Sequence, residues 1–95
     1  MSVYFIGQVK LSDSEAYDRY MEAATPSVIA AGVKVLAADD APVKVEGDWH
    51  GHRVVIMEFE DEAAFRAWYD SPEYQKAKLI RMPAADLRAA LVHGL

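Results

Sequence analysis

Glu58 is the residue of this 95-residue chain whose type and position best suit acid–base chemistry. It stands near the end of the apolar run Val54 to Phe59, which is typical of a central β-strand. A carboxylate on a half-apolar surface can have a raised pKa and act as a general base. Alternatively, Glu58 reaches water or pairs with a cation such as Arg53. Both interpretations stay open at this stage.

Aromatic residues and arginines suggest a second kind of chemistry, the binding of a flat organic ligand in a pocket. Tyr74 and Arg81 are seven residues apart on one predicted helix, so they share a face. There Arg81 could bind a substrate carboxylate, or instead hold Glu58, Asp70 or a backbone carbonyl. The predicted substrate-binding residues are Tyr4, Trp49, Arg53, Tyr69, Tyr74 and Arg81. For Tyr69, helical spacing with Trp68 favours a place in the core instead.

A possible metal site consists of Asp48, His50 and His52, which alternate along the chain. In an extended segment all three would point to one side and could hold a divalent cation. Gly51 and the position in a loop favour a solvated hairpin tip instead, so no metal site is predicted. No phosphate loop or dinucleotide motif occurs, and no histidine stands out as a haem ligand, so no cofactor is predicted.

The composition is that of a globular protein, with 53% hydrophobic and 26% charged residues. A net charge of −5 and scattered Lys and Arg argue against nucleic acid and against an anionic membrane as partners. Disulfides and thiolate chemistry are excluded because the chain has no cysteine. No secretory signal or membrane-spanning run is visible, so a cytoplasmic location is expected.

The elements that must position these residues follow the order β-α-β-β-α-β. Strands are predicted over residues 3–9, 33–38, 53–59 and about 87–93. The first helix is predicted to begin at Ser12, whose spacing to Glu15 fits a capping box, and to break at Thr25-Pro26. Residues 43–46 are a possible continuation of the second strand.

The second helical segment is predicted to have two parts, each with its own cap. Asp61 caps the first part, and Ser71 caps the second, where Pro72 occupies the first turn. The second part runs to about Arg81, and Met82-Pro83 is expected to be extended. The chain is therefore predicted to be one domain, residues 1–95, with an α+β ferredoxin-like fold.

One sheet with both helical segments on the same face leaves its other face open. Two sets of strand residues follow from the alternation. The purely apolar set, predicted to lie under the helices, is Val3, Phe5, Val9, Val55, Met57 and Phe59. The mixed set, predicted to face a second copy and any pocket, is Tyr4, Ile6, Gln8, Val54, Ile56 and Glu58. We therefore expect a homodimer that pairs its open sheet faces.

Several of these residues form a recognisable pattern. Glu46-Gly47-Asp48-Trp49, the run from Trp68 to Tyr74 and Arg81 resemble a family of about this length with no assigned function. That family is similar to the dimeric α/β-barrel group, in which two ferredoxin-like domains face their sheets together. The matching positions are Tyr4, Trp49, Glu58, Trp68, Tyr69, Ser71, Tyr74 and Arg81. His50 and His52 do not match.

The resemblance implies a range of functions rather than one. The wider group includes cofactor-free antibiotic-biosynthesis monooxygenases, muconolactone-isomerase-like enzymes, haem-dependent relatives and stress-responsive domains. One hypothesis is therefore a cofactor-independent enzyme for a small molecule, with isomerase or monooxygenase-like chemistry. The alternative is a non-catalytic dimeric domain that binds a ligand or assists another protein. The sequence leaves open whether the protein is an enzyme.

Overall fold

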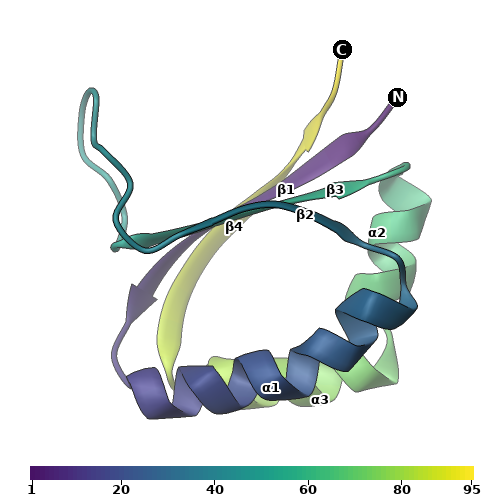
Figure 1. The fold of residues 1–95 in the computed structure, drawn as a ribbon, viewed down its shortest axis with the longest axis horizontal. Coiled ribbons are helices and arrows are strands. Elements are labelled where there is room, and N and C mark those ends of the chain that lie inside the picture. Colours follow the sequence, from purple (N-terminus) through teal and green to yellow (C-terminus); the bar gives the residue numbers. More distant parts are fainter.

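The computed structural model describes residues 1–95 as a four-stranded antiparallel sheet with three helices on one face (Figure 1). The strands are β1 (Val3–Leu11), β2 (Lys34–Asp39), β3 (Arg53–Phe59) and β4 (Ala85–His93). The helices are α1 (Ser14–Ala30), α2 (Glu62–Tyr69) and α3 (Pro72–Arg81). The strands lie in the order β2-β3-β1-β4. The predicted ferredoxin-like fold is confirmed, with the second helical segment divided into α2 and α3.

The predicted caps of α2 and α3 are both present. The Asp61 carboxylate accepts a hydrogen bond from the backbone N–H of Ala64 at 2.8 Å. The Ser71 hydroxyl accepts one from the N–H of Tyr74 at 3.2 Å, and Pro72 occupies the first turn of α3. Each cap satisfies an N–H group that has no partner within its own helix. These starts are determined locally, which is why the sequence predicts them correctly.

Helix α1 differs from the prediction at its start and in its middle. Asp13 is the cap and accepts from Ala16 N at 3.0 Å, whereas the Ser12 hydroxyl donates to the Ala84 carbonyl at 3.0 Å. The expected break at Thr25-Pro26 is wrong, because α1 runs without interruption to Ala30. An internal proline bends a helix, and the last turns of α1 rise towards the sheet in Figure 1.

Two connections also differ from expectation. Residues 43–46 do not continue β2, which ends at Asp39 after a bulge between Val35 and Ala37. Met82-Pro83 is a turn rather than an extended segment, since Met82 has helical φ and ψ angles of −52° and −44°. The N–H of Ala84 closes this turn on the Arg81 carbonyl at 2.8 Å. Strand β4 therefore begins at Ala85, two residues earlier than expected.

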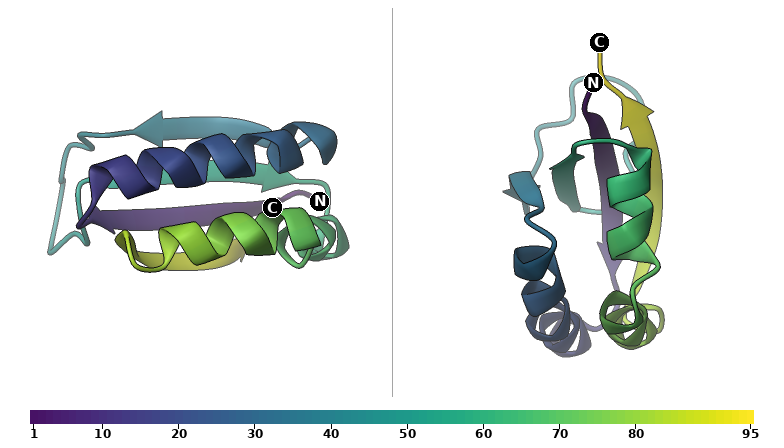
Figure 2. Two further views of the ribbon diagram at one scale, coloured as in Figure 1. Left: turned by 90° about the horizontal axis from the view of Figure 1, so that it is seen from below. Right: turned by 90° about the vertical axis from the view of Figure 1, so that its right-hand side faces the viewer.

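The helix-covered face carries the core. Phe5 pairs with Met57 and Val3 with Phe59 across β1 and β3, and all four side chains are buried. Helices α1 and α3 lie side by side beneath this face (Figure 2). The predicted apolar set is thus confirmed as the set under the helices. None of the three helices has the length and apolar character that a membrane span requires.

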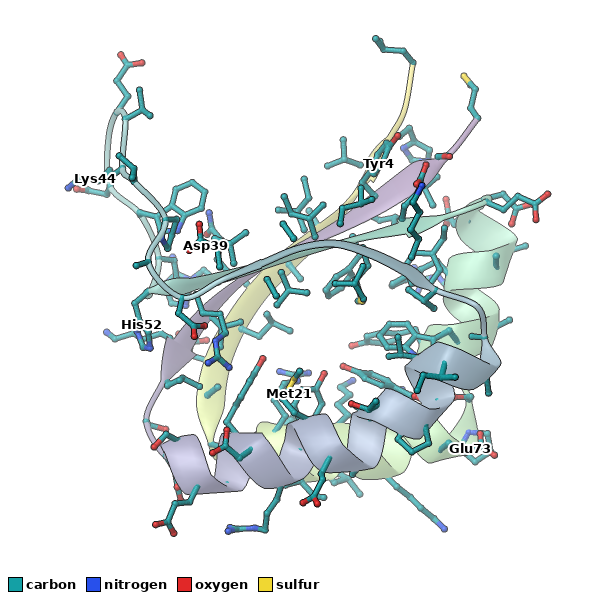
Figure 3. All side chains as sticks on the ribbon, viewed as in Figure 1. Tyr4, Met21, Asp39, Lys44, His52 and Glu73 are labelled. Atoms are coloured by element: carbon teal, nitrogen blue, oxygen red, sulfur yellow. The ribbon has the colours of Figure 1, made fainter.

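The opposite face of the sheet has no helix over it (Figure 1). The register pairs Tyr4 with Glu58, Ile6 with Ile56 and Gln8 with Val54 on this face. In Figure 3 Tyr4 lies above the sheet, on the side away from Met21 and the helices. We call this surface the open face. The side chains at the centre of the open face are apolar, although no helix of the chain covers them.

Candidate functional site

An apolar cavity with a volume of about 370 Å³ lies between the sheet and the helices α1 and α3. Phe5, Val55 and Met57 form part of its ceiling, and Tyr20 and Tyr74 part of its floor. Of its 19 lining residues, 16 are hydrophobic, so the cavity suits a largely apolar ligand. The sequence analysis placed the pocket on the mixed face, whereas this cavity lies on the other side of the sheet.

The cavity opens at the edge of the sheet, between α1 and the edge strand β2. Three of its lining side chains are well exposed there: Met21, Ile29 and Val35. Figure 3 shows Met21 on α1, pointing towards the space beneath the sheet. A ligand would therefore enter past β2, with its apolar part against these side chains.

Arg81, the last residue of α3, brings a cation into the cavity wall. Its residue is only 6% exposed, it forms no ion pair, and its Nε atom has no hydrogen-bond partner. Its guanidinium carbon lies 5.7 Å from the centroid of the Tyr20 ring. A cation–π contact is worth at most about 2 kcal/mol, whereas burying an ion costs several kcal/mol. The buried charge of Arg81 is therefore not neutralised within the chain, and a bound anion would stabilise it.

Two phenols lie beside this cation. The hydroxyl oxygens of Tyr20 and Tyr74 are 2.9 Å apart and share a hydrogen bond. Burial, reinforced by the nearby Tyr74, raises the pKa of Tyr20 well above its usual value. Burial also raises the pKa of Tyr17, although Arg53 partly opposes this shift. The hydroxyls of Tyr17 and Tyr20 therefore stay protonated at neutral pH and act as hydrogen-bond donors rather than as bases.

No carboxylate, histidine or lysine lines the cavity. Its titratable groups are Tyr17, Tyr20, Tyr74 and Arg81. The polar chemistry available to a ligand is thus one permanent cation and a group of protonated hydroxyls. This set binds an anion well, but it supplies no side chain that takes up a proton near pH 7.

Aromatic rings give the cavity flat walls. The Trp68 ring lies 4.2 Å from that of Tyr74 and 6.5 Å from that of Phe5, measured between centroids. The indole N–H of Trp68 donates to the Ser27 hydroxyl at 3.2 Å, which fixes the ring. The cavity therefore presents flat aromatic surfaces against which a planar ligand can stack.

The other predicted ligand-binding residues lie outside the cavity lining. Arg53 forms an ion pair with Asp40, its guanidinium carbon lies 5.0 Å from the centroid of the Tyr17 ring, and it does not line the cavity. Tyr69 is half-buried at the end of α2, next to Lys78. Tyr4 lies on the open face, and Trp49 lies in the loop before β3 and is 43% exposed. Of the six predicted residues, the cavity brings together only Tyr74 and Arg81.

Glu58 lies on the open face and not in the cavity. Its carboxylate is 3.8 Å from the ammonium group of Lys34, and its side chain is 24% exposed. Within a single chain, Glu58 therefore does not line an enclosed cavity. Its role as a general base stays a prediction, and one that requires another molecule to cover this face.

The possible metal ligands are not brought together. The His50 Nε2 atom lies 3.0 Å from the backbone carbonyl of Asp86 and 3.5 Å from its carboxylate. No group of three or more acidic, histidine or cysteine side chains has the geometry of a metal site. The candidate set of Asp48, His50 and His52 is therefore not a cluster, because His50 turns towards β4.

Comparison with known protein families identifies the chain. Residues 2–95 match the family described as "Domain of unknown function (DUF1330)". The chain belongs to the DUF1330 family. The resemblance to a family of this size with no assigned function is confirmed, and the match covers nearly the whole chain. No curated protein matches this DUF1330 chain.

Solved structures similar to this DUF1330 chain share its fold. A protein of unknown function from Rhodopseudomonas palustris is 25% identical, with a TM-score of 0.82 over 99% of this chain and 82% of that one. SnoaB, a cofactor-independent oxygenase from Streptomyces nogalater, is 13% identical, with a TM-score of 0.71 over 99% and 93%. A dimeric ferredoxin-like protein of unknown function from Thermobifida fusca is 20% identical, with a TM-score of 0.68 over 99% and 92%.

The sequence analysis did not single out Tyr20 as a candidate site residue of this DUF1330 chain. Tyr17, Tyr20, Met21 and Ala24 have the spacing of one apolar helical stripe. The signal that could have found the site is the presence of two phenols on this otherwise apolar stripe. Buried hydroxyls need partners, and the stripe supplies none itself.

Proposed function

We propose that this protein binds a small, flat organic acid beneath its sheet and stabilises the deprotonated oxygen of that acid with Arg81. The observation that carries the proposal is the buried Arg81 guanidinium, which has no ion-pair partner. A carboxylate, phenolate or enolate would supply the missing partner through charge-assisted hydrogen bonds. The apolar remainder of the ligand would fill the space beside Phe5 and Trp68.

The same arrangement supports chemistry without a cofactor. A cation beside an acidic group lowers the pKa of that group, because it favours the charged form. Both an isomerisation and a reaction with oxygen can begin from an enolate or phenolate of the substrate. Because the cavity has no base, the substrate must be acidic enough to lose its proton to water. That SnoaB is a cofactor-independent oxygenase supports the view that this fold can serve such chemistry.

The absence of a base in the cavity favours a second candidate, the binding of the same acid without turnover. The two candidates differ in what happens to the bound molecule and not in how it is held. A hydroxynaphthoate and a dihydroxynaphthalene, incubated with the protein in D₂O under air, separate them. Deuterium incorporation or oxygen uptake above the protein-free rate supports an enzyme. Unchanged ligand despite saturation supports a binding domain.

Calorimetric titration with a matched ligand pair tests the binding proposal. A hydroxynaphthoate should bind at least about 10-fold more tightly than its neutral primary amide. The preference should disappear in Arg81→Met, which keeps the apolar stem but removes the charge. Arg66→Met is the matched control, because Arg66 is an exposed cation on α2 that does not line the cavity. Equal affinity of the wild type for acid and amide contradicts the proposal.

We also infer that a second copy of the chain covers the open face. Ile6, Ile56 and Val92 lie there with no helix over them. A similar solved structure from Thermobifida fusca is described as a dimeric ferredoxin-like protein, which supports the arrangement. Pairing two such faces would bury on the order of 1,200–2,000 Å², the usual range for a stable interface.

Light scattering at micromolar concentration tests the dimer. The expected mass is twice the 10.6 kDa of one chain. A single-chain mass at that concentration would contradict the dimer but would leave the cavity proposal intact.

A further inference from the structure

The segment from Asp40 to His52, which we call the arm, joins β2 to β3 and extends beyond the open face (Figure 1). Figure 3 shows Lys44 near its far end, on the side of the sheet opposite the helices. The arm contains no helix or strand. It projects on the same side of the sheet as the uncovered apolar surface (Figure 1).

The base of the arm is firmly attached to the sheet. Arg53 forms an ion pair with Asp40, and His50 Nε2 lies 3.0 Å from the Asp86 carbonyl. The N–H of His52 donates to the Val9 carbonyl at 3.1 Å. Gly51 has a φ of 74°, and a Cβ atom there would lie 2.1 Å from the Val9 oxygen, so only glycine fits. These contacts fix the direction in which the arm leaves the sheet.

The outer part of the arm is apolar and unprotected. Val43 is 88% exposed and Val45 is 90% exposed, and Trp49 nearer the base is 43% exposed. A single exposed valine is ordinary in a globular protein. Here, however, two almost fully exposed valines lie on an arm whose base is fixed, and the arm stands beside an uncovered apolar face. This combination indicates a surface that another molecule covers.

We propose that the arm packs against a second copy of the chain, with Val43 and Val45 buried on that partner. This inference rests on the proposed dimer. Paired sheets lie about 10 Å apart, whereas the six residues after Asp39, from Asp40 to Val45, can span up to roughly 20 Å. The arm is therefore long enough to reach past the plane of the facing sheet and to flank its end. The arm carries three carboxylates, Asp40, Glu46 and Asp48, against the single ammonium group of Lys44, so its excess of negative charge makes an anionic membrane or nucleic acid a poor partner.

Sedimentation measurements of the dimer dissociation constant test the arm. The double variant Val43→Ser/Val45→Ser should raise the constant at least about 10-fold, because each dimer loses four buried valine side chains. Leu79→Ser is the matched control, since Leu79 is 70% exposed on α3, on the helix side. It should leave the constant unchanged. Both substitutions are at exposed positions, so neither threatens folding.

A label at the arm tip gives an independent readout. The chain has no cysteine, so Val45→Cys and Leu79→Cys each accept one polarity-sensitive fluorophore. The emission of the Val45→Cys label should shift to shorter wavelength as protein concentration rises through the dissociation constant, and that of the Leu79→Cys label should not. If the wild type is a dimer, but the double variant has the same dissociation constant and the Val45→Cys label stays exposed to solvent, the arm proposal is wrong and the dimer stands. A monomeric wild type would overturn both.

Discussion

The two faces of the sheet are built from alternate residues of the same strands, yet they differ in cover and in polar content. Neighbouring residues show the difference directly: Phe5 is buried among the aromatic rings of α2, whereas Tyr4 is half-buried on the uncovered side. The covered face encloses a cavity with one unpaired cation, and the open face carries an apolar centre beside the Lys34–Glu58 pair.

This difference separates two demands that the chain must meet. On the covered face, the chain buries its own apolar side chains, and only Arg81 is left without a partner, which a small anion could supply. On the open face, a whole apolar surface is uncovered, and only another macromolecule is large enough to bury it. The proposed small-molecule site and the proposed association surface therefore lie on opposite sides of one sheet. The following predictions test that division, in order of decreasing effect.

Truncation of two adjacent residues on β1 should affect different properties, the stability of the fold in one case and association in the other. Phe5→Ala should lower the free energy of unfolding by about 3–5 kcal/mol, because it removes a buried aromatic side chain from the core. Tyr4→Ala should instead weaken association and leave the fold of each chain largely intact. Urea denaturation at two protein concentrations separates the two effects, because dimer stability depends on concentration. Similar losses for both variants at both concentrations would break the comparison.

Removal of one polar group from each face should affect ligand affinity on one side only. Tyr74→Phe leaves the Tyr20 hydroxyl without its partner, which should cost about 1–3 kcal/mol of stability and weaken binding of an aromatic acid. Glu58→Gln should leave that affinity unchanged. Calorimetric titration of both variants with the same hydroxynaphthoate measures this. If Glu58→Gln abolished turnover while binding persisted, the base role predicted for Glu58 would be restored.

Alkaline pH should destabilise the covered face through Tyr20. Burial raises the pKa of Tyr20 above the value of 10.0 expected for the unfolded chain, so the unfolded state ionises first. The stabilisation is complete below pH 10 and decreases above it, by about 1.4 kcal/mol per pH unit for each such tyrosine. Urea denaturation between pH 9 and 11.5 follows this loss, and Tyr20→Phe should reduce the slope. An unchanged slope in that variant would show that Tyr20 titrates alike in both states.

The smallest effect is expected for the ion pair on the open face. Lys34→Gln removes the partner of Glu58, but the Lys34 side chain is 73% exposed and the two charged groups are 3.8 Å apart. Solvent screens such a pair, so the stability of the chain should change by less than about 0.5 kcal/mol. Thermal denaturation at low and high salt checks this value. A larger loss would mean that a partner shields the pair from water in solution.

Local features of the chain were predictable because they depend on nearby residues. Strand β3 has the predicted bounds, and Asp61 and Ser71 cap the predicted helices. Alternation along β1 and β3 correctly separated the two faces, since side chains alternate with a period of two. The ferredoxin-like order followed from these elements and from the handedness of the crossovers.

The candidate site was predicted only in part. Tyr74 and Arg81 were recognised because they share a face of α3, which is a local property. Tyr20 contacts Tyr74 across 54 residues of sequence, and no local pattern announces such a contact. The start of α1 shows the same limit. Both the backbone N–H and the hydroxyl of Ser12 donate to the distant Ala84 carbonyl, at 2.9 and 3.0 Å, and Asp13 caps the helix instead.

The sequence by itself determined the elements, their order and which side chains share a face, because these depend on periodicity and on short-range capping. Only the tertiary structure decided that the cavity lies between the sheet and the helices, that Arg81 enters it without an ion-pair partner, and that Glu58 faces away. The physical reason is that burial and pairing of a charge depend on groups far apart in the chain. Folding alone brings those groups together or leaves them apart.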